Sequence, residues 1–319
     1  MAKNENLHKA KTAKNDEFYT QLSDIEKEMV HYKDHFKGKT IYCNCDDARE
    51  SNFFKFFSLN FEKLGLKKLI TTGYKADGQG VALIYEGDKN GNRLPDTEEI
   101  TIRPLQGNGD FRSEECIEFL KEADIVVTNP PFSLFREYIA QLMEYGKKFL
   151  IIGNKNAITY KELFPYIKNS QLWLGCTMQT GGRFYLPSDT TETTSVAARV
   201  NEKGQNTVLI CGAHWFTNLE HDMRNKPLDL YKHYSNEYKH YDNYDAIEVG
   251  KTCDIPMDYD GVMGVPITFL DKYCPEQFEI IGMGEDNGTG HSGGVWLGGS
   301  KSCLVNGKAA FKRIFIKRK

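Results

Sequence analysis

Short apolar runs alternate with amphipathic stretches through the first half of this 319-residue chain. The apolar runs have the length of buried strands and lie at 40–45, 67–72, 124–127 and 148–153. The stretches with helical patterns lie at 51–64, 114–123, 133–145 and 159–168. Alternation of this kind predicts a parallel sheet covered by helices, in which ligands bind at the carboxyl ends of the strands.

Punctuation signals mark the ends of the predicted helices. Ser51 and Ser133 stand where helix N-caps belong, and Gly65 and Gly146 follow the last turns. Residues 81–105 instead alternate short apolar runs with Gly, Asn and Pro, which predicts a hairpin between two strands of the sheet.

The alternation stops after about residue 175. Residues 208–212 form one more predicted strand, and Tyr-rich and Gly-rich stretches follow it. We therefore expect an α/β protein with a doubly wound, mostly parallel Rossmann-like sheet in residues 1–220. Residues 221–319 are expected to form a separate, mixed α+β region.

The composition excludes several classes of protein. Hydrophobic residues make up 40% of the chain and charged residues 27%, which is ordinary for a globular protein and excludes a disordered or fibrous one. The apolar runs are far shorter than the ~18 residues that cross a bilayer, and the N-terminus lacks the apolar core of a signal peptide. We expect a cytoplasmic protein without membrane contact. The eight cysteines include no CxxC pair, so no metal site is expected.

Positive charge collects at the two ends of a chain whose net charge is −3. Residues 1–14 carry four lysines and one glutamate, and residues 308–319 carry six cations and no acid. Such ends suit contact with phosphate groups, and solvated tails explain them equally well.

The most informative motif is Asn129-Pro130-Pro131-Phe132, which directly follows the predicted strand when that strand is taken to end at Thr128. This sequence suits methylation of an exocyclic or amide nitrogen, whose delocalised lone pair makes it a poor nucleophile. The side-chain carbonyl of Asn129 and the main-chain carbonyl of Pro130 supply two acceptors for the hydrogens of that nitrogen. The prolines stiffen the loop, and Phe132 offers a ring on which a flipped base stacks. A simple Asn-Pro turn would explain only two of the four residues.

Two further segments suit a methyl donor. Tyr19 and Thr20 lie in the string DEFYTQ, which resembles the N-terminal segment that cradles S-adenosylmethionine in methyltransferases of base amino groups. Without the other motifs, the same string would indicate only the start of a helix. Asp110 and Phe111 precede the helix near 113, where a carboxylate and a ring suit an adenine moiety. A loop with an exposed acid explains these two residues equally well.

The chain resembles the EcoRI-type adenine-specific DNA methyltransferase family. The similar stretches cover most of residues 7–175, and their sequences are LHKAKTAKNDEFYTQ, YCNCDDARESNFFKFF, GLKKLI, TNPPFSLFREYI and KKFLIIGN. The stretch MGVPITFLDKYCPEQFEIIG at 263–282 and the ending RIFIKRK look like restriction-linked members of the same group.

The resemblance implies roles for several residues. It implies that the loop 129–132 is catalytic, and that the residues that bind S-adenosylmethionine are Tyr19, Thr20, Asn44, Asp46, Asp110 and Phe111. Two departures stand out. The turn after the first strand lacks the glycines that are usual in methyltransferases, so either Asp46 or Asp47 could be the residue that binds the cofactor there. The second strand ends without the acidic residue that usually binds the ribose of the cofactor.

The expected function is transfer of a methyl group from S-adenosylmethionine to N6 of adenine in double-stranded DNA after base flipping. The setting implied is restriction–modification or phage DNA protection, with a cognate restriction endonuclease that forms no stable complex. Two alternatives remain. One is a methyltransferase of RNA adenine or protein glutamine, and the other is a non-catalytic DNA-binding relative.

Candidate DNA contacts lie in the second half of the chain. Tyrosines recur every three or four residues between 228 and 244, with lysines and histidines between them, and suit either base stacking or core packing. The candidate phosphate contacts are Arg183, Lys312, Arg313, Lys317 and Arg318. A competing interpretation makes 313–316 a final strand with Phe311, Ile314 and Ile316 packed inward.

Overall fold

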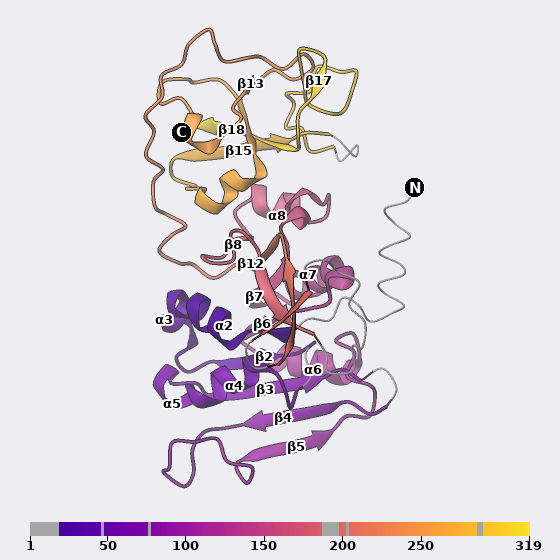
Figure 1. Ribbon diagram of the computed structural model, residues 1–319. Coiled ribbons are helices and arrows are strands. Elements are labelled where there is room, and N and C mark those ends of the chain that lie inside the picture. Colours follow the sequence, from indigo (N-terminus) through magenta and orange to yellow (C-terminus); the bar gives the residue numbers. More distant parts are fainter. Residues whose placement is uncertain (1–18, 46–47, 76–77, 187–197, 202–203, 286–289) are drawn as a thin grey trace. The chain divides into compact units, whose positions relative to one another are not determined.

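The computed structural model describes residues 19–45, 48–75, 78–186, 198–201, 204–285 and 290–319. The chain divides into two compact units (Figure 1). The first comprises Met1–Lys155 and Gly175–Leu219, and the second comprises Asn156–Leu174 and Glu220–Lys319. Residues 156–174, which precede the expected boundary at 220, therefore belong to the second unit.

The first unit is built on a large mixed sheet. The strands that the first unit contributes are, in spatial order, β5 (Ile100–Pro104), β4 (Val81–Tyr85), β3 (Lys68–Gly73), β2 (Thr40–Cys43), β6 (Ile125–Thr128), β7 (Lys148–Asn154) and β12 (Ala213–Thr217). The neighbours β3, β2, β6 and β7 are parallel, whereas β4, β5 and β12 join by antiparallel pairing. The expected α/β class is confirmed, but the expectation of a mostly parallel sheet is wrong because antiparallel strands extend both edges.

Helices cover both faces of this sheet because side chains of the central strands alternate between them. Ile41 and its neighbours on one face pack against α2 (Leu22–Met29), α4 (Asn52–Leu59) and α5 (Phe61–Leu64). On the other face, Tyr42 meets Phe119 of α6 (Glu114–Glu122), with ring centroids 6.2 Å apart. The central strands are buried throughout, as parallel strands between two helical layers must be.

The sequence signals at helix ends were right in some places and wrong in others. Ser51 caps α4, and its hydroxyl accepts from the amides of Phe53 and Phe54. Gly65 ends α5 with a left-handed φ of 62°. Ser133 is not an N-cap, because the chain first forms a 3₁₀ turn, η2 (Phe132–Leu134), and α7 (Phe135–Glu144) begins after it.

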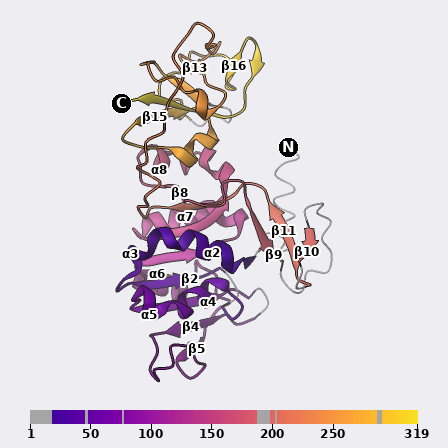
Figure 2. The same ribbon diagram turned by 60° about the vertical axis from the view of Figure 1, so that its left-hand side comes forward.

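A second sheet of the first unit contains β1 (Tyr19–Thr20), β9 (Gly182–Tyr185), β11 (Asn206–Ile210) and β10 (Ala198–Val200), in that order. All of its pairings are antiparallel, and Figure 2 shows it beside the main sheet. The predicted strand at 208–212 thus belongs here rather than to the main sheet. The predicted helix at 159–168 is also shorter than expected, because η3 (Lys155–Thr159) precedes α8 (Phe164–Lys168).

The second unit has its own sheet and hydrophobic core. Its sheet consists of β13 (Ile247–Glu248), β14 (Met263–Pro266), β18 (Arg313–Arg318) and β15 (Phe278–Met283). A small hairpin joins β16 (Leu304–Val305) to β17 (Lys308–Ala309). The remaining elements of the second unit are β8 (Trp173–Leu174), η4 (Thr252–Asp254) and η5 (Ile267–Lys272). The remaining elements of the first unit are η1 (Val30–Tyr32) and α3 (Lys33–Phe36).

Candidate active site

Parallel pairing brings the ends of β3, β2 and β6 to one edge of the main sheet. Cys43 of β2 pairs with Thr71 of β3, and Ile41 pairs with Ile125 of β6. Asn44 and Asn129, each the first residue after its strand, therefore lie at neighbouring positions on this carboxyl edge. This is the edge at which the open sheets of α/β proteins bind their ligands.

Asn44 is held by two buried hydroxyl groups. Thr128 donates to its main-chain carbonyl, and Tyr138 of α7 donates to its side-chain carbonyl. Burial raises the pKa of Tyr138, with nearby Cys45 and Tyr42 adding to the effect, so that the phenol stays protonated and donates. Asn44 thus links β2, β6 and α7 and fixes the spacing of the edge.

The loop at Asn129 is stiff and mostly enclosed. Asn129 is only 7% exposed, Pro130 is buried, and Pro131 has the extended backbone (φ −53°, ψ 129°) that leads into η2. Phe132 is partly buried and packs against the hydrophobic core of the first unit. The loop is therefore fixed by the fold rather than free in solvent.

A glycine on the neighbouring strand lets the helix after this loop approach the sheet. A Cβ atom on Gly153 of β7 would overlap the ring of Phe135, the first residue of α7. The Phe135 ring also meets Phe216 of β12, edge to face, with centroids 5.0 Å apart. Close packing at Gly153 thus sets where the helix begins, and with it where the Asn129 loop ends.

The loop at 107–112 packs against the end of β3. The amide of Lys75 donates to the carbonyl of Asn108 at 2.8 Å. Gly109 has a φ of +81°, and a Cβ atom there would overlap the carbonyl oxygen of Gly73. Only glycine tolerates both constraints. This contact carries Asp110 and Phe111 to the carboxyl edge although no strand ends directly before them.

Asp110 and Phe111 are both engaged within the first unit. Arg112 donates to both carboxylate oxygens of Asp110, at 2.9 and 2.7 Å, and this bond holds the pKa of Asp110 below its usual range. Phe111 is buried and meets Tyr138 edge to face, with centroids 5.0 Å apart. Gln141 donates to the carbonyl of Phe111 at 3.2 Å. Phe111 is thus tied to α7, which also carries the partner of Asn44. Asp110 is tied to α7 through Arg112, which donates to Glu137 at 3.0 Å.

Tyr19 and Thr20 reach the start of α4. The side chain of Asn52 donates to the carbonyl of Thr20 at 2.7 Å, while β1 pairs with β9 through Tyr19 and Tyr185. Thr20 is 1% exposed, and its hydroxyl bonds to no residue that the structure describes. The same holds, within the described ranges, for the buried hydroxyl of Thr71 at the end of β3. Buried hydroxyls of this kind suit a polar ligand, because an unmet hydrogen bond is costly.

The turn after β2 departs from the glycine-rich pattern in a specific way. Cys45 takes a positive φ of 66°, a conformation that usually calls for glycine. Asp46, and Asp47 as the alternative to it, lie outside the described residues.

The predicted phosphate contacts fall into different environments. Arg183 lies on β9 and donates to Thr207 at 3.1 Å. Lys312 is partly exposed and donates to the hydroxyl of Thr159 at 2.9 Å. Lys317 is exposed, and Arg318 donates to the carbonyl of Met257.

Arg313 lies in the interior of the second unit. It is 9% exposed, and its guanidinium contacts the Glu248 carboxylate at 2.5 to 3.1 Å. The competing interpretation of a final strand is correct for β18, where Ile314 and Ile316 are fully buried. It is wrong for Phe311, which precedes the strand and is 89% exposed.

The tyrosine-rich segment mixes both predicted roles. Tyr241 and Tyr244 are buried in the core of the second unit, where each packs against Phe315. Tyr234 stacks on Tyr238 and on Tyr259, while Tyr231 is exposed. The spacing of three or four residues therefore reflects an irregular, extended chain rather than one helical face.

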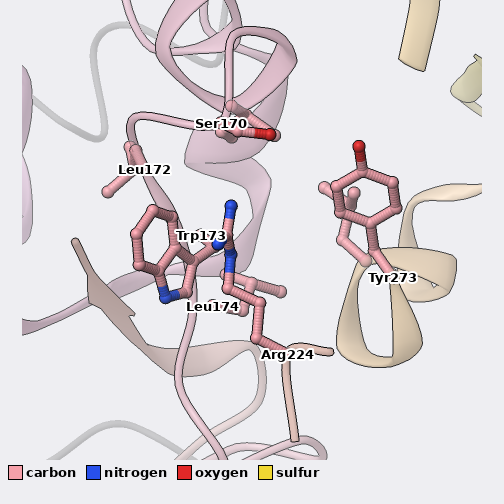
Figure 3. A pocket seen from close by; sticks show the side chains of 8 residues that line it. Ser170, Leu172, Trp173, Leu174, Arg224 and Tyr273 are labelled. Atoms are coloured by element: carbon pink, nitrogen blue, oxygen red, sulfur yellow. The ribbon is translucent and has the colours of Figure 1, made fainter. Parts of the chain in front are cut away.

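The described residues of each unit line a cavity. One of about 660 Å³ opens beside Tyr19, and Tyr19 is the only predicted cofactor residue among the described residues that line it. The other, in the second unit, lies beside Arg224, which stacks 3.6 Å from the Trp173 ring centroid (Figure 3). Its interior of about 10 Å³ holds one water molecule at most, too little for a cofactor or a nucleotide.

Sequence reasoning missed the residues that hold the edge together: Thr128, Tyr138 and Arg112. Tyr138 lies three positions after Phe135 on a helix whose inward residues were otherwise predictable, and this spacing is the signal that could have identified it.

In the parts of the chain that the structure describes, no helix is long and apolar enough to cross a membrane. The same ranges contain no group of three His, Cys, Asp or Glu side chains that could hold a metal ion.

Known proteins match this chain over nearly its whole length. It is 48% identical over 329 residues to Type II methyltransferase M.EcoRI of Escherichia coli, covering 100% of this chain and 98% of that protein. It is 42% identical over 279 residues both to Type II methyltransferase M.MgeORF184P of Mycoplasma genitalium and to Type II methyltransferase M.MpnI of Mycoplasma pneumoniae. These matches cover 86% of this chain and 85% and 84% of those proteins. The family described as adenine-specific methyltransferase EcoRI matches residues 6–319, and the chain belongs to that family.

Proposed function

We propose that this adenine-specific methyltransferase transfers a methyl group from S-adenosylmethionine to N6 of adenine in double-stranded DNA. The observation that carries the proposal is the stiff, mostly enclosed Asn129-Pro130-Pro131-Phe132 loop at the carboxyl edge of a parallel strand in a chain of this family. The mixed sheet of the first unit is then a Rossmann-like methyltransferase sheet, and residues 221–319 form the target-recognition region.

The residues of the edge divide the work of orienting the target base. The side-chain carbonyl of Asn129 and the main-chain carbonyl of Pro130 accept the two amino hydrogens, which turns the nitrogen lone pair toward its electrophile. Phe132 stacks on the ring of the base. Asn129 is 7% exposed, and a base stacked within a duplex would not reach it, which supports flipping of the base before reaction.

S-adenosylmethionine, when bound, supplies the electrophilic methyl group. The residues proposed to hold it are Tyr19, Thr20, Asn44, Asp46, Asp110 and Phe111. Among these, the buried hydroxyl of Thr20 fits a polar ligand, since no described residue satisfies it. Asn44 acts by fixing the edge through Tyr138, and the Asp46 assignment rests on the family resemblance.

DNA contacts outside the edge are proposed at Arg183, Lys312, Lys317 and Arg318. Arg313 is proposed to serve the fold instead, because Glu248 takes up its guanidinium. The biological setting proposed is restriction–modification or phage DNA protection in the cytoplasm, with a cognate endonuclease that forms no stable complex.

Nucleoside analysis tests the reaction. Unmethylated duplex DNA is incubated with the protein and S-adenosylmethionine, digested to nucleosides and analysed by mass spectrometry. We expect N6-methyl-2′-deoxyadenosine from DNA, no N6-methyladenosine from RNA and no N-methylglutamine from a glutamine peptide under the same conditions. A methylated cytosine, or methylation of RNA or peptide without methylation of DNA, would contradict the proposal.

A further inference from the structure

A loop of the second unit is held rigidly from within. The side chain of Asn243 donates to the carbonyls of Ser300 and Ser302, at 2.5 and 2.8 Å. Tyr244 donates to the carbonyl of Lys301 at 2.7 Å. Gly298, with a φ of +112°, makes the turn at the tip. Residues 296–302 are therefore an ordered loop whose backbone is tied to the segment at 243–244.

The hairpin that follows is held by the same segment. The carboxylate of Asp242 accepts from the amides of Asn306 and Gly307, at 3.2 and 2.7 Å, in the turn between β16 and β17. The amide of Leu304 donates to the side chain of Asn243 at 2.9 Å. Loop and hairpin thus form one anchored element.

This anchored element displays large apolar side chains to solvent. Phe311 is 89% exposed, Leu297 is 68% exposed and Trp296 is 37% exposed. Their neighbours Val295 and Phe315 are buried in the core of the second unit, so the exposed side chains are not part of that core. Exposed aromatic and aliphatic groups on an ordered backbone are typical of a binding surface.

The charge of the surrounding chain favours one class of partner. Residues 290–319 contain no Asp or Glu, and Lys301 and Lys308 are exposed on the same loop and hairpin. The carboxylate of Asp242 beneath the hairpin is taken up by amides of the hairpin turn. A basic surface with aromatic and aliphatic side chains complements phosphate groups and base edges together.

We infer that the surface formed by Trp296, Leu297, Lys301, Lys308 and Phe311, the loop–hairpin surface, is where the second unit contacts duplex DNA. The inference rests on the proposed function and adds the residues through which DNA is held. Phe311 and Leu297 contact base or sugar groups in a groove, and the lysines contact phosphates. In both Figure 1 and Figure 2 the hairpin of β16 and β17 lies on the opposite side of the second unit from the C-terminus, so the hairpin that carries Lys308 is separate from the last residues of the chain.

The experiment measures binding of a short duplex by fluorescence anisotropy over a series of salt concentrations. The duplex carries the site found by sequencing methylated adenines in DNA from expressing cells. Phe311→Ala is expected to weaken binding about tenfold, in the range for loss of an aromatic contact to a base. Lys301→Gln with Lys308→Gln is expected to reduce the slope of log K against log salt by about 1.8, which corresponds to two phosphate contacts.

Matched controls separate the surface from general effects. Leu94→Ala removes an exposed leucine of the first unit, 55% exposed against 68% for Leu297. It is expected to leave affinity unchanged when Leu297→Ala lowers it. Lys226→Gln with Lys251→Gln removes two exposed charges of the second unit elsewhere and is expected to preserve the salt slope. Melting temperature and S-adenosylmethionine binding should stay at wild-type values in all these variants.

The outcomes distinguish failure of the loop–hairpin inference from failure of the proposed function. If the wild-type protein methylates the duplex and the surface variants keep its affinity and salt slope, the loop–hairpin surface is not the contact and the proposed function stands. If Phe311→Ala lowers the melting temperature, or changes the oligomeric state without changing DNA affinity, the surface serves the fold or a protein interface and the inference is overturned. A wild-type protein that neither binds nor methylates duplex DNA contradicts the proposed function itself.

Discussion

The carboxyl edge of the main sheet and the loop–hairpin surface treat their side chains in opposite ways. At the edge, polar groups are buried and bonded to one another, as in the link from Tyr138 to Asn44. At the surface, large apolar groups such as Phe311 stand in solvent on an ordered backbone. The difference separates two requirements. Chemistry on a weakly nucleophilic nitrogen needs acceptors fixed in advance, whereas contact with a long polymer needs groups that remain open to it.

The two regions should accordingly respond to mutation in opposite ways. Substitutions at the edge should alter stability or turnover, while substitutions at the surface should alter DNA affinity alone. Three variants sharpen this contrast.

The largest effect is expected where β18 enters the core, two residues after the exposed Phe311. Arg313→Gln removes the cation that contacts the mostly buried carboxylate of Glu248, which then keeps the hydroxyl of Tyr241 as a donor. Loss of one member of a buried ion pair typically costs 3–5 kcal/mol, so we expect a loss of about 3 kcal/mol in unfolding free energy. Urea denaturation followed by the fluorescence of the protein measures it. Arg313→Leu combined with Glu248→Leu should recover part of the loss. Wild-type stability in Arg313→Gln would show that the ion pair does not hold the strand.

A smaller effect is expected at the edge itself. Tyr138→Phe keeps the ring packing against Phe111 but removes the donor to the side chain of Asn44. A buried acceptor left unsatisfied costs about 1–3 kcal/mol, and the looser edge should also lower the single-turnover rate. Tyr231→Phe, which changes an exposed tyrosine of the second unit, is the control. Equal rates and melting temperatures for the two variants would show that the Tyr138 hydroxyl does not hold Asn44 in place at the edge.

The smallest effect is expected at the chain end. Lys317 lies opposite Glu279 across the β15–β18 pairing, which already offsets part of its charge. Lys317→Gln with Lys319→Gln is therefore expected to reduce the salt slope of DNA binding by only about 0.9, one phosphate contact. A reduction as large as that of the Lys301 and Lys308 variant would shift the main contact to the chain end. A lowered melting temperature would show that Lys317 and Lys319 stabilise the folded protein.

Sequence reasoning found the parts of the fold that repeat and missed the parts that depend on distant partners. The buried strands around Ile41, Val126 and Leu150 were predictable, because burial between two helical layers leaves a local apolar signature. The strand β12 was missed because it reads Ala-His-Trp-Phe-Thr, and its burial depends on antiparallel pairing with β7. A partner that lies about 60 residues away in the chain leaves no such local signature, whereas the hairpin of β4 and β5 was predictable from residues 81–105.

The site shows the same division. The Asn129 loop was recognisable because its four residues are adjacent in the chain. The groups that hold it in place come from distant segments, since Thr128 and Asn44 are 84 positions apart and Tyr138 and Asn44 are 94 positions apart. The contact of Gly109 with Gly73 is equally remote in sequence. Spacing along the chain does not encode these approaches, so only the folded structure reveals them.

The most direct test of the central claim, that the Asn129 loop orients the reacting nitrogen, is the single-turnover rate of Asn129→Ala on duplex DNA. Loss of one positioned hydrogen bond in the transition state typically lowers a rate by about 10²–10³. We predict a loss of that size, with S-adenosylmethionine binding and melting temperature at wild-type values. A variant that transfers the methyl group at the wild-type rate would contradict the account.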